Sequence, residues 1–267
     1  MADDTQAQLQ SLHAHMDSYE WVHDMMNYGT ALFWFLGYVI IIWKVKKDRS
    51  AAGISLQSLF ALFLSEFNNV VLQVILAWTY NFSLGLAFWI CDVSTSILSF
   101  FSWYHIFTKY YSSYEKDRDT FGLKFCRVLP NNLGKKVYAF FLYFVAFVIT
   151  IPLFIFRRTR LPTLYSLYEC FDDTMLALAL IPQLYMFYNR RPRRVSSLLG
   201  HFVVLLFIAR LCALSYWLTY PIFHSGAIPS RGLHICTELF NLLILLDFLY
   251  YYLVAAVKGE KDIALPL

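Results

Sequence analysis

The sequence is poor in charged residues. Asp, Glu, Lys and Arg make up only 15% of its 267 residues, against about 25% in a typical soluble domain. Hydrophobic residues reach 59% and aromatic residues 19%. With 10 glycines and 8 prolines the chain is no collagen-like fibre, and its apolarity excludes a disordered segment, a nucleic-acid-binding tail and an ordinary cytosolic enzyme. The composition indicates a membrane protein without nucleic-acid partners.

The sequence also lacks the motifs of metal and catalytic sites. No two cysteines stand in CxxC spacing, so neither a zinc site nor a disulfide framework is indicated. HExxH, GxSxG, Walker and glycine-rich dinucleotide motifs are absent. We therefore expect no enzyme, no cofactor and no metal. The five cysteines are Cys91, Cys126, Cys170, Cys212 and Cys236.

Long apolar runs predict seven membrane spans. A helix needs about 20 mostly apolar residues to cross the hydrocarbon core of a bilayer. We therefore expect an all-α membrane protein with a polar, acidic lumenal extension over residues 1–27, a transmembrane domain over 28–257 and a tail over 258–267. The predicted spans are Tyr28–Trp43, Leu59–Trp78, Leu84–Phe107, Val137–Phe156, Tyr168–Tyr188, Leu199–Tyr220 and His234–Val257.

The basic residues predict the orientation of these spans. Seventeen lysines and arginines lie in the loops and the tail on one side, against four on the other side. Lys and Arg concentrate in cytoplasmic loops. We therefore expect the N-terminus in the lumen and the C-terminus in the cytosol. The four lumenal residues are Arg157, Arg158, Arg160 and Arg231.

Two ionisable residues lie deep within neighbouring spans. Arg210 is about 16 Å and Asp247 about 15 Å from the cytosolic ends of their spans, at 1.5 Å per residue. An ion pair is the simplest way to hold both charges at that depth. The pair either joins two helices only or takes part in binding a ligand or a proton. Trp217 shares the helical face of Arg210, seven residues on.

Further polar residues accompany this predicted pair. Glu66, Asn68 and Asn69 in the second span are able to hydrogen-bond across helices. We expect Asp172 and Asp173 to be solvated near a lumenal span end, and His234 to lie at the membrane interface.

Two segments of the sequence resemble each other about 141 residues apart. In both, a basic loop is followed by a β-branched residue, a serine and a new apolar run, at Ile54-Ser55 and at Val195-Ser196. This spacing predicts two parallel three-helix bundles joined by a linking fourth helix. Parallel repeats of this kind place a binding site between the two halves.

Five collinear motifs resemble the ER lumen protein-retaining receptor family (the Lys-Asp-Glu-Leu receptors), which is related to PQ-loop and sugar-transporter folds. The resemblance implies a seven-span sorting receptor of the endoplasmic reticulum and cis-Golgi membrane. Such a receptor binds the C-terminal retention signals of lumenal proteins at the lower Golgi pH and returns these proteins to the ER through the retrograde vesicle coat. The motifs are Ser50–Ser55; Tyr114-Glu115 with Asp119-Thr120-Phe121; Ile181–Met186; His201-Phe202 with Arg210 and Trp217; and Asp247–Tyr250 with Lys258-Gly259 and Leu265-Pro266.

The resemblance implies roles for particular residues and also shows departures. Arg210 and Trp217 are expected to line the ligand site, with Asp247 or Glu66 as the proton-accepting group. Lys258 and Lys261 are expected to signal to the coat. The remaining ligand-binding arginines of the family are replaced, at Asp24, at Phe67 or Asn69, and at Tyr220. An altered signal, weaker binding or lost retrieval follows from these replacements.

One alternative remains open on the same fold. A PQ-loop-type carrier of a small solute needs a cavity that is reachable from both sides of the membrane. In such a carrier Asn68 and Asn69 would hydrogen-bond the solute.

Overall fold

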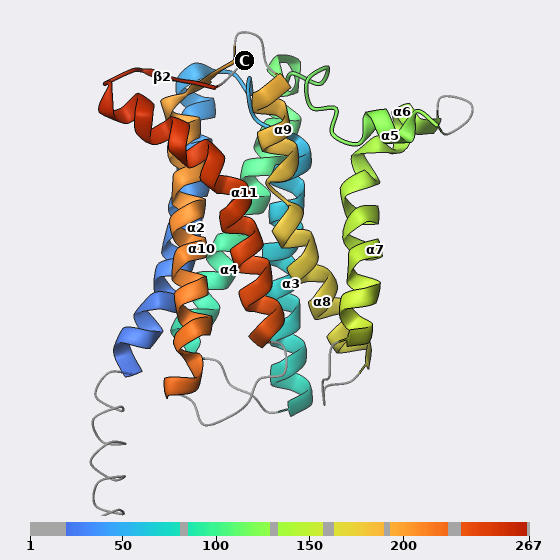
Figure 1. Cartoon of the computed structure of the whole chain (residues 1–267), viewed down its shortest axis with the longest axis vertical. Coiled ribbons are helices and arrows are strands. Elements are labelled where there is room, and N and C mark those ends of the chain that lie inside the picture. Colours follow the sequence, from blue (N-terminus) through green and yellow to red (C-terminus); the bar gives the residue numbers. More distant parts are fainter. Residues whose placement is uncertain are drawn as a thin grey trace, which may run out of the picture.

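The computed structural model describes residues 20–80, 85–128, 133–156, 163–189, 193–223 and 231–265, which are almost all helical (Figure 1). In chain order the elements are α2 (Glu20–Asp48), α3 (Leu56–Tyr80), α4 (Leu86–Lys109), η1 (Tyr111–Ser113), α5 (Leu123–Cys126), α6 (Leu133–Val137), η2 (Tyr138–Phe140), α7 (Phe141–Phe156), α8 (Thr163–Leu178), α9 (Ile181–Asn189), β1 (Arg194–Ser196), α10 (Ser197–Phe223), α11 (Arg231–Val257) and β2 (Asp262–Ala264).

Six of these helical segments are long and apolar enough to cross a membrane, which confirms an all-α membrane protein. They correspond to the first, second, third, fourth, sixth and seventh predicted spans. The segment Tyr138–Ile155, which is mostly α7, is the most hydrophobic. Its Phe144 and Ile155 side chains are 64% and 70% exposed. Lipid is the solvent that such a surface requires.

The fifth predicted span is not one helix, so the prediction of seven single helices is not confirmed. The chain leaves the helix at Ala179-Leu180 and continues as α9 in nearly the same direction (Figure 1). Pro182 explains the break, because proline has no N–H to donate and its ring clashes with the preceding turn, whereas the first turn of a new helix tolerates it. Neither α8, with 16 residues, nor α9, with 9, has the length of a span.

The first helix begins earlier than predicted, at Glu20 rather than Tyr28. His23, inside a polar stretch, is fully buried. Its ring stacks on Tyr216 and Phe223 of α10 with centroid distances of 4.2 and 5.0 Å. An apolar-run criterion misses this turn because its packing depends on aromatic residues nearly 200 positions away.

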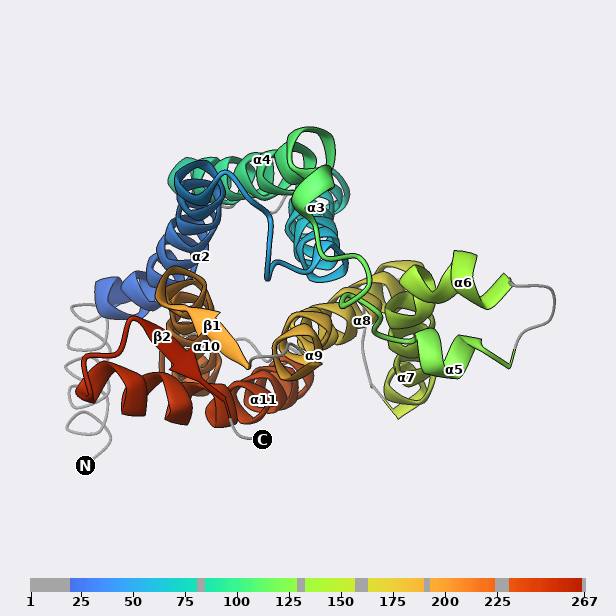
Figure 2. The same cartoon turned by 90° about the horizontal axis from the view of Figure 1, so that it is seen from above.

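Six helices form a ring in which each packs against the next (Figure 2). The order around the ring is α2, α4, α3, α8, α11 and α10, and α10 closes it against α2. Helix α7 packs against α8 outside the ring. Helices α2 and α10 approach closely at Gly37, where an added Cβ would lie 3.4 Å from Phe202 and Leu206. Small residues permit such close helix contacts in membranes.

One end of the ring is rich in lysine and arginine. We use "basic end" for the end formed by residues 44–55, 110–128, 193–196 and 258–265, where α2, α4, α9 and α11 terminate (Figure 1). Here β2 pairs antiparallel with β1, with Val195 opposite Ile263. The Leu265 amide donates to the Arg193 carbonyl at 2.9 Å. The C-terminal tail is therefore folded back onto the bundle.

Candidate functional site

A buried ion pair joins α10 to α11. Arg210 Nη1 donates to Glu238 Oε1 at 2.9 Å, and the two side chains are only 3% and 10% exposed. The prediction that Asp247 pairs with Arg210 is wrong. Its carboxylate instead accepts a hydrogen bond from the Tyr188 hydroxyl at the end of α9.

The tilt of α11 explains the error. The predicted depth of Asp247 assumes that α11 follows the membrane normal. The last turns of α11 instead lean away towards β2 (Figure 1). Residues near that end therefore lie closer to the basic end than their number suggests. Glu238 lies nine residues before Asp247, which places it about 13 Å further from the basic end along the helix. It is the acid that reaches the level of Arg210.

The ion pair is incompletely hydrogen-bonded within the described residues. Arg210 Nε and Glu238 Oε2 are buried without a hydrogen-bond partner there. The guanidinium lies 4.8 Å from the centre of the Trp34 ring, which is within the range of a cation–π contact. A buried network that is partly satisfied is costly by itself, so these two atoms are candidates for contact with a ligand.

Next to this pair, His234 lies between two acids of α8. Its Nδ1 is 3.1 Å from Asp173 Oδ1, and its Nε2 is 3.6 Å from Glu169 Oε1. The Trp217 ring stacks on the imidazole at 4.2 Å. Arg210 and Trp217 thus both face α11, as predicted. The expectation of a solvated Asp173 is wrong, because its side chain is largely buried. The His234 side chain, in the first turn of α11, is equally enclosed.

A third group of polar contacts joins α3 to α8. Asn68 Nδ2 donates to Asp172 Oδ1 at 3.1 Å, and Ser65 Oγ donates to Asp172 Oδ2 at 3.3 Å. Tyr168 donates to Asn68 Oδ1. Asp172 is only 7% exposed, so the expectation that it is solvated is wrong. Interhelical hydrogen bonding by Asn68 is confirmed.

Asn69 and Glu66 face other partners. Asn69 lies on the outer side of α3 and donates to Asp92 of α4 at 3.4 Å, so its interhelical hydrogen bond is also confirmed. Glu66 is close enough to Arg210, Asp92 and Asp172 to interact with each electrostatically.

Together these residues form a group that we name the interior acid cluster. It has five carboxylates and two cationic or protonatable partners within one region of the ring. Such a cluster attracts cationic groups and holds an anionic group only at the guanidinium. Its members are Glu66, Glu169, Asp172, Asp173 and Glu238, with Arg210 and His234.

A second buried network lies at the basic end, where three of the recognised motifs meet. Ser55 caps α3, because its Oγ accepts from the Ser58 amide, and it donates to Asp119 Oδ1 at 2.9 Å. The Ser55 amide donates to Gln183 Oε1 at 2.8 Å, and Gln183 Nε2 donates to the Gly53 carbonyl at 2.7 Å. We name Ser55, Tyr114, Asp119 and Gln183 the loop network.

The Asp119 carboxylate is saturated with donors. Tyr114 donates to Oδ2 at 2.6 Å, and the Gln57 amide donates to the same atom at 3.4 Å. Burial raises the pKa of Asp119, although these hydrogen bonds oppose the shift. The three motifs are recognisable in the sequence, but the contact between them is not. Polar residues next to apolar runs, at Ser55 and Gln183, are the only local signal for this contact, and Asp119 lies in a polar loop.

The two tail lysines lie in the segment between α11 and β2. Lys258 and Lys261 are exposed, while Ile263 between β1 and α10 is buried. The close approach of the tail to α10 is visible at Gly200, where an added Cβ would lie 2.3 Å from Ile263 Cδ1.

Known proteins resemble this chain along most of its length. The family described as ER lumen protein retaining receptor matches residues 50–220, a region that begins in the loop network and includes Arg210 and Trp217. An ER lumen protein-retaining receptor of Dictyostelium discoideum is 25% identical over 92% of this chain and 98% of its own length. Receptor 3 of Xenopus tropicalis is 26% identical over 87% and 93%, and receptor 2 of Bos taurus is 26% identical over 85% and 92%.

Proposed function

The chain belongs to the ER lumen protein retaining receptor family, and we propose that it is a multi-pass receptor of ER and Golgi membranes that binds the C-terminal retention signals of lumenal proteins and returns them to the ER in retrograde vesicles. This is a family of receptors rather than of enzymes. The matched relatives carry receptor names, so the small-solute carrier is not favoured.

The proposed orientation places the basic end in the cytosol and the opposite end in the lumen. Its support is the excess of lysine and arginine on one side. Helices α8 and α9 together act as the fifth crossing. The packing order supports two parallel units, because the third helix of each triplet lies between the other two: α4 between α2 and α3, and α11 between α8 and α10. Part of the predicted lumenal arginine cluster, at residues 157–160, lies outside the described residues.

The observation that carries the proposal is the incompletely bonded Arg210–Glu238 pair within the ring. In our proposal the terminal carboxylate of a cargo protein takes the open Nε position of Arg210, because charge-assisted bonds to arginine are the strong means of holding a carboxylate. Trp217 covers the site from the lumenal side, beside His234. Glu66 and Asn68 face the same region, whereas Asn69 and Asp247 contact other partners.

The interior acid cluster sets the chemistry of the signal. The excess of five carboxylates over Arg210 and His234 disfavours acidic side chains in the ligand, so the proposed signal combines a free C-terminal carboxylate with neutral or basic side chains. Lower pH adds protons to the cluster and reduces its repulsion of any acidic ligand. Binding of an acidic peptide therefore strengthens as pH falls, with Glu66 as the proposed proton acceptor because the nearby carboxylates of Asp92 and Asp172 disfavour a further negative charge there.

Immobilised peptides test this proposal. The purified full chain in detergent is captured on Lys-Asp-Glu-Leu and on Lys-Asn-Gln-Leu at pH 6.0 and 7.4, with C-terminally amidated peptides as controls. We expect Lys-Asn-Gln-Leu, which lacks acidic side chains, to bind better than Lys-Asp-Glu-Leu at pH 7.4. Binding of Lys-Asp-Glu-Leu should increase at pH 6.0. The amidated forms should fail. Equal capture of free and amidated peptides, or no capture at either pH, would contradict the proposal.

The exposed Lys258 and Lys261 are the proposed contact for the retrograde vesicle coat. The Lys258→Ala, Lys261→Ala double variant should keep its fold, because neither lysine contributes to the β1–β2 pairing. Without the coat contact it should accumulate in the Golgi. A double variant that returns to the ER at the normal rate would remove this role.

A further inference from the structure

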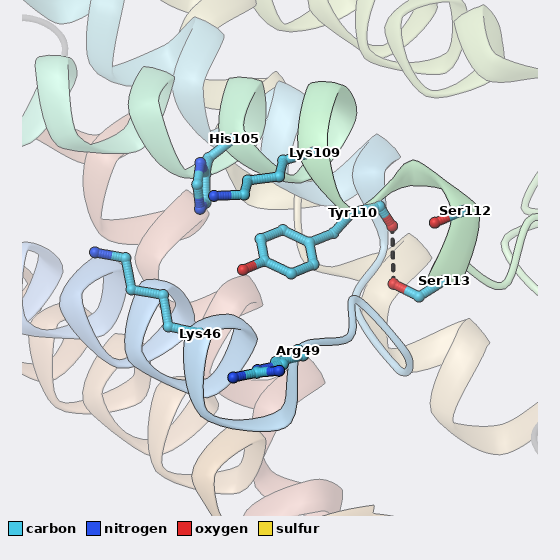
Figure 3. A pocket seen from close by; sticks show the side chains of 7 residues that line it. All are labelled: Lys46, Arg49, His105, Lys109, Tyr110, Ser112 and Ser113. Carbon is cyan, nitrogen blue, oxygen red and sulfur yellow. Dashed lines mark hydrogen bonds between the residues drawn. The ribbon is translucent and has the colours of Figure 1, made fainter.

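A pocket of about 540 Å³ opens at the basic end, away from the interior acid cluster. It lies between the last turn of α2 and the end of α4 with the turn that follows (Figure 3). Its volume is within the range of small-molecule sites. The residues that line it include Lys46 and Arg49 from α2 and its end, and His105, Lys109 and Tyr110 from α4 and its end.

The charges that line this pocket are of one sign. Among the described residues Lys46, Arg49 and Lys109 make no ion pair, and no acidic side chain lines the pocket. His105 is close enough to Lys46 and Lys109 to interact with both charges. Its Nε2 is buried without a hydrogen-bond partner within the described part of the chain. A concave site with three uncompensated cations attracts an anion.

The backbone at Arg49 is a second, independent observation. Arg49 has a φ of +49°, and among the described residues it is the one non-glycine residue with a positive φ. It follows the last residue of α2, a position where glycine is the usual residue because it adopts this conformation without strain. A side chain kept in a strained conformation at the rim of a pocket points to a function for its charge.

The level of the pocket in the membrane indicates what kind of anion reaches it. Trp43 and Phe107 lie on α2 and α4 within three residues of the pocket-lining Lys46 and Lys109 and are 54% and 49% exposed. Lys47 lies 5.8 Å from the centre of the Trp43 ring. Exposed aromatic side chains next to lysines are typical of the headgroup level. Basic pockets between helices at that level suit phosphorylated lipid headgroups.

From these observations we propose that the pocket binds the phosphomonoester headgroup of an anionic phospholipid, such as a phosphatidylinositol monophosphate, in the leaflet at the basic end. Lys46, Arg49 and Lys109 surround the phosphate. The Tyr110 hydroxyl, which points towards α2 (Figure 3), donates to a phosphate oxygen. The lipid tails lie along the exposed apolar surface of α2 and α4. A phosphomonoester carries nearly two negative charges near neutral pH, which matches the number of cations better than a phosphodiester does.

A titration of the purified full chain tests the proposal without reference to its orientation or to cargo. The probes are short-chain phosphatidylinositol 4-phosphate, short-chain phosphatidylserine and the free headgroup inositol 1,4-bisphosphate, followed by native mass spectrometry. We expect the first probe to bind most tightly. Equal binding of phosphatidylserine would indicate attraction to surface charge alone. Equal binding of the free headgroup would indicate a soluble phosphate ligand. Either result overturns the proposal.

Variants locate the binding in the pocket. Each cation removed should weaken binding of phosphatidylinositol 4-phosphate about fivefold, so Lys46→Gln with Lys109→Gln should weaken it about 25-fold. Arg49→Gly should weaken binding about fivefold while leaving thermal stability unchanged or raised, because glycine relieves the strained backbone. Lys116→Gln, an exposed lysine outside the pocket, is the matched control and should have no effect. Pocket variants that bind like the control would refute the site.

Discussion

The two buried polar networks of this protein differ in how completely they are hydrogen-bonded. In the loop network, both carboxylate oxygens of Asp119 have hydrogen-bond partners, and so do the oxygen and the nitrogen of the Gln183 side-chain amide. In the interior acid cluster, Arg210 Nε and Glu238 Oε2 have no hydrogen-bond partner among the described residues. A satisfied network fixes one arrangement of the chain, whereas an incomplete one leaves groups that a ligand can complete. We therefore propose that the first network serves the fold and that the second serves binding.

The largest expected loss of stability comes from breaking the ion pair of the interior acid cluster. Arg210→Ala leaves Glu238 buried among further carboxylates without its ion-pair partner. Removing one partner of a buried pair costs about 3–5 kcal/mol, so the melting temperature in detergent should fall by roughly 10 °C. Arg210→Gln with Glu238→Gln removes both charges and keeps a hydrogen bond. This double variant should melt near the wild-type temperature, and a double variant that melts as low as Arg210→Ala would refute the pairing.

A somewhat smaller loss is expected in the loop network. Asp119→Ala removes the acceptor of Ser55, Tyr114 and the Gln57 amide, and unsatisfied buried donors cost about 1–3 kcal/mol. Thermal unfolding measures this loss. Because the network serves the fold, peptide binding by the protein that remains folded should be unchanged. Weakened binding with normal stability would erase the distinction between the two networks.

Stability should depend on pH through Asp119 of the loop network, with a smaller effect of definite sign. Burial raises the pKa of Asp119, so the folded state holds this proton more tightly than the unfolded state. The resulting stabilisation is present at pH values below the unfolded pKa and is lost as pH rises through the folded pKa. Asp119→Asn does not titrate. The melting temperature of the wild type relative to this variant should therefore decrease from pH 4 to pH 7, and an increase would contradict the shift.

The smallest effect is expected outside both networks. Asn69 is exposed on α3, and its contact with Asp92 is long, at 3.4 Å, while Gln73 also donates to that carboxylate. Asn69→Leu should leave both stability and peptide binding nearly unchanged, within about 0.5 kcal/mol. Loss of binding in this variant would revive a role for Asn69 in holding a ligand.

The sequence predicted the helices well because apolar length is a local property. The predicted Leu59–Trp78 and His234–Val257 lie within α3 and α11. It failed at α2, where the first turn depends on the burial of His23 against α10. It also failed between α8 and α9, where one proline outweighs a continuous apolar run.

The candidate site was predicted in part. The sequence identified Arg210 and its need for a buried acid, and it placed Trp217 on the same face. It chose Asp247 over Glu238 because helix tilt is set by tertiary packing and is absent from a residue count. The partners of His234 and Asp172 were missed for a related reason. Near the end of a predicted span, polar residues that are solvated and polar residues that pair across helices have the same local pattern.

Peptide binding by the Arg210→Gln, Glu238→Gln double variant tests the central claim most directly. Isothermal titration with free and amidated Lys-Asn-Gln-Leu at pH 7.4 would compare this variant with the wild type, after thermal unfolding has shown that both are folded. The account predicts that the wild type binds the free peptide only and that the double variant, though folded, binds neither. A folded double variant that binds the free peptide as tightly as the wild type would contradict it.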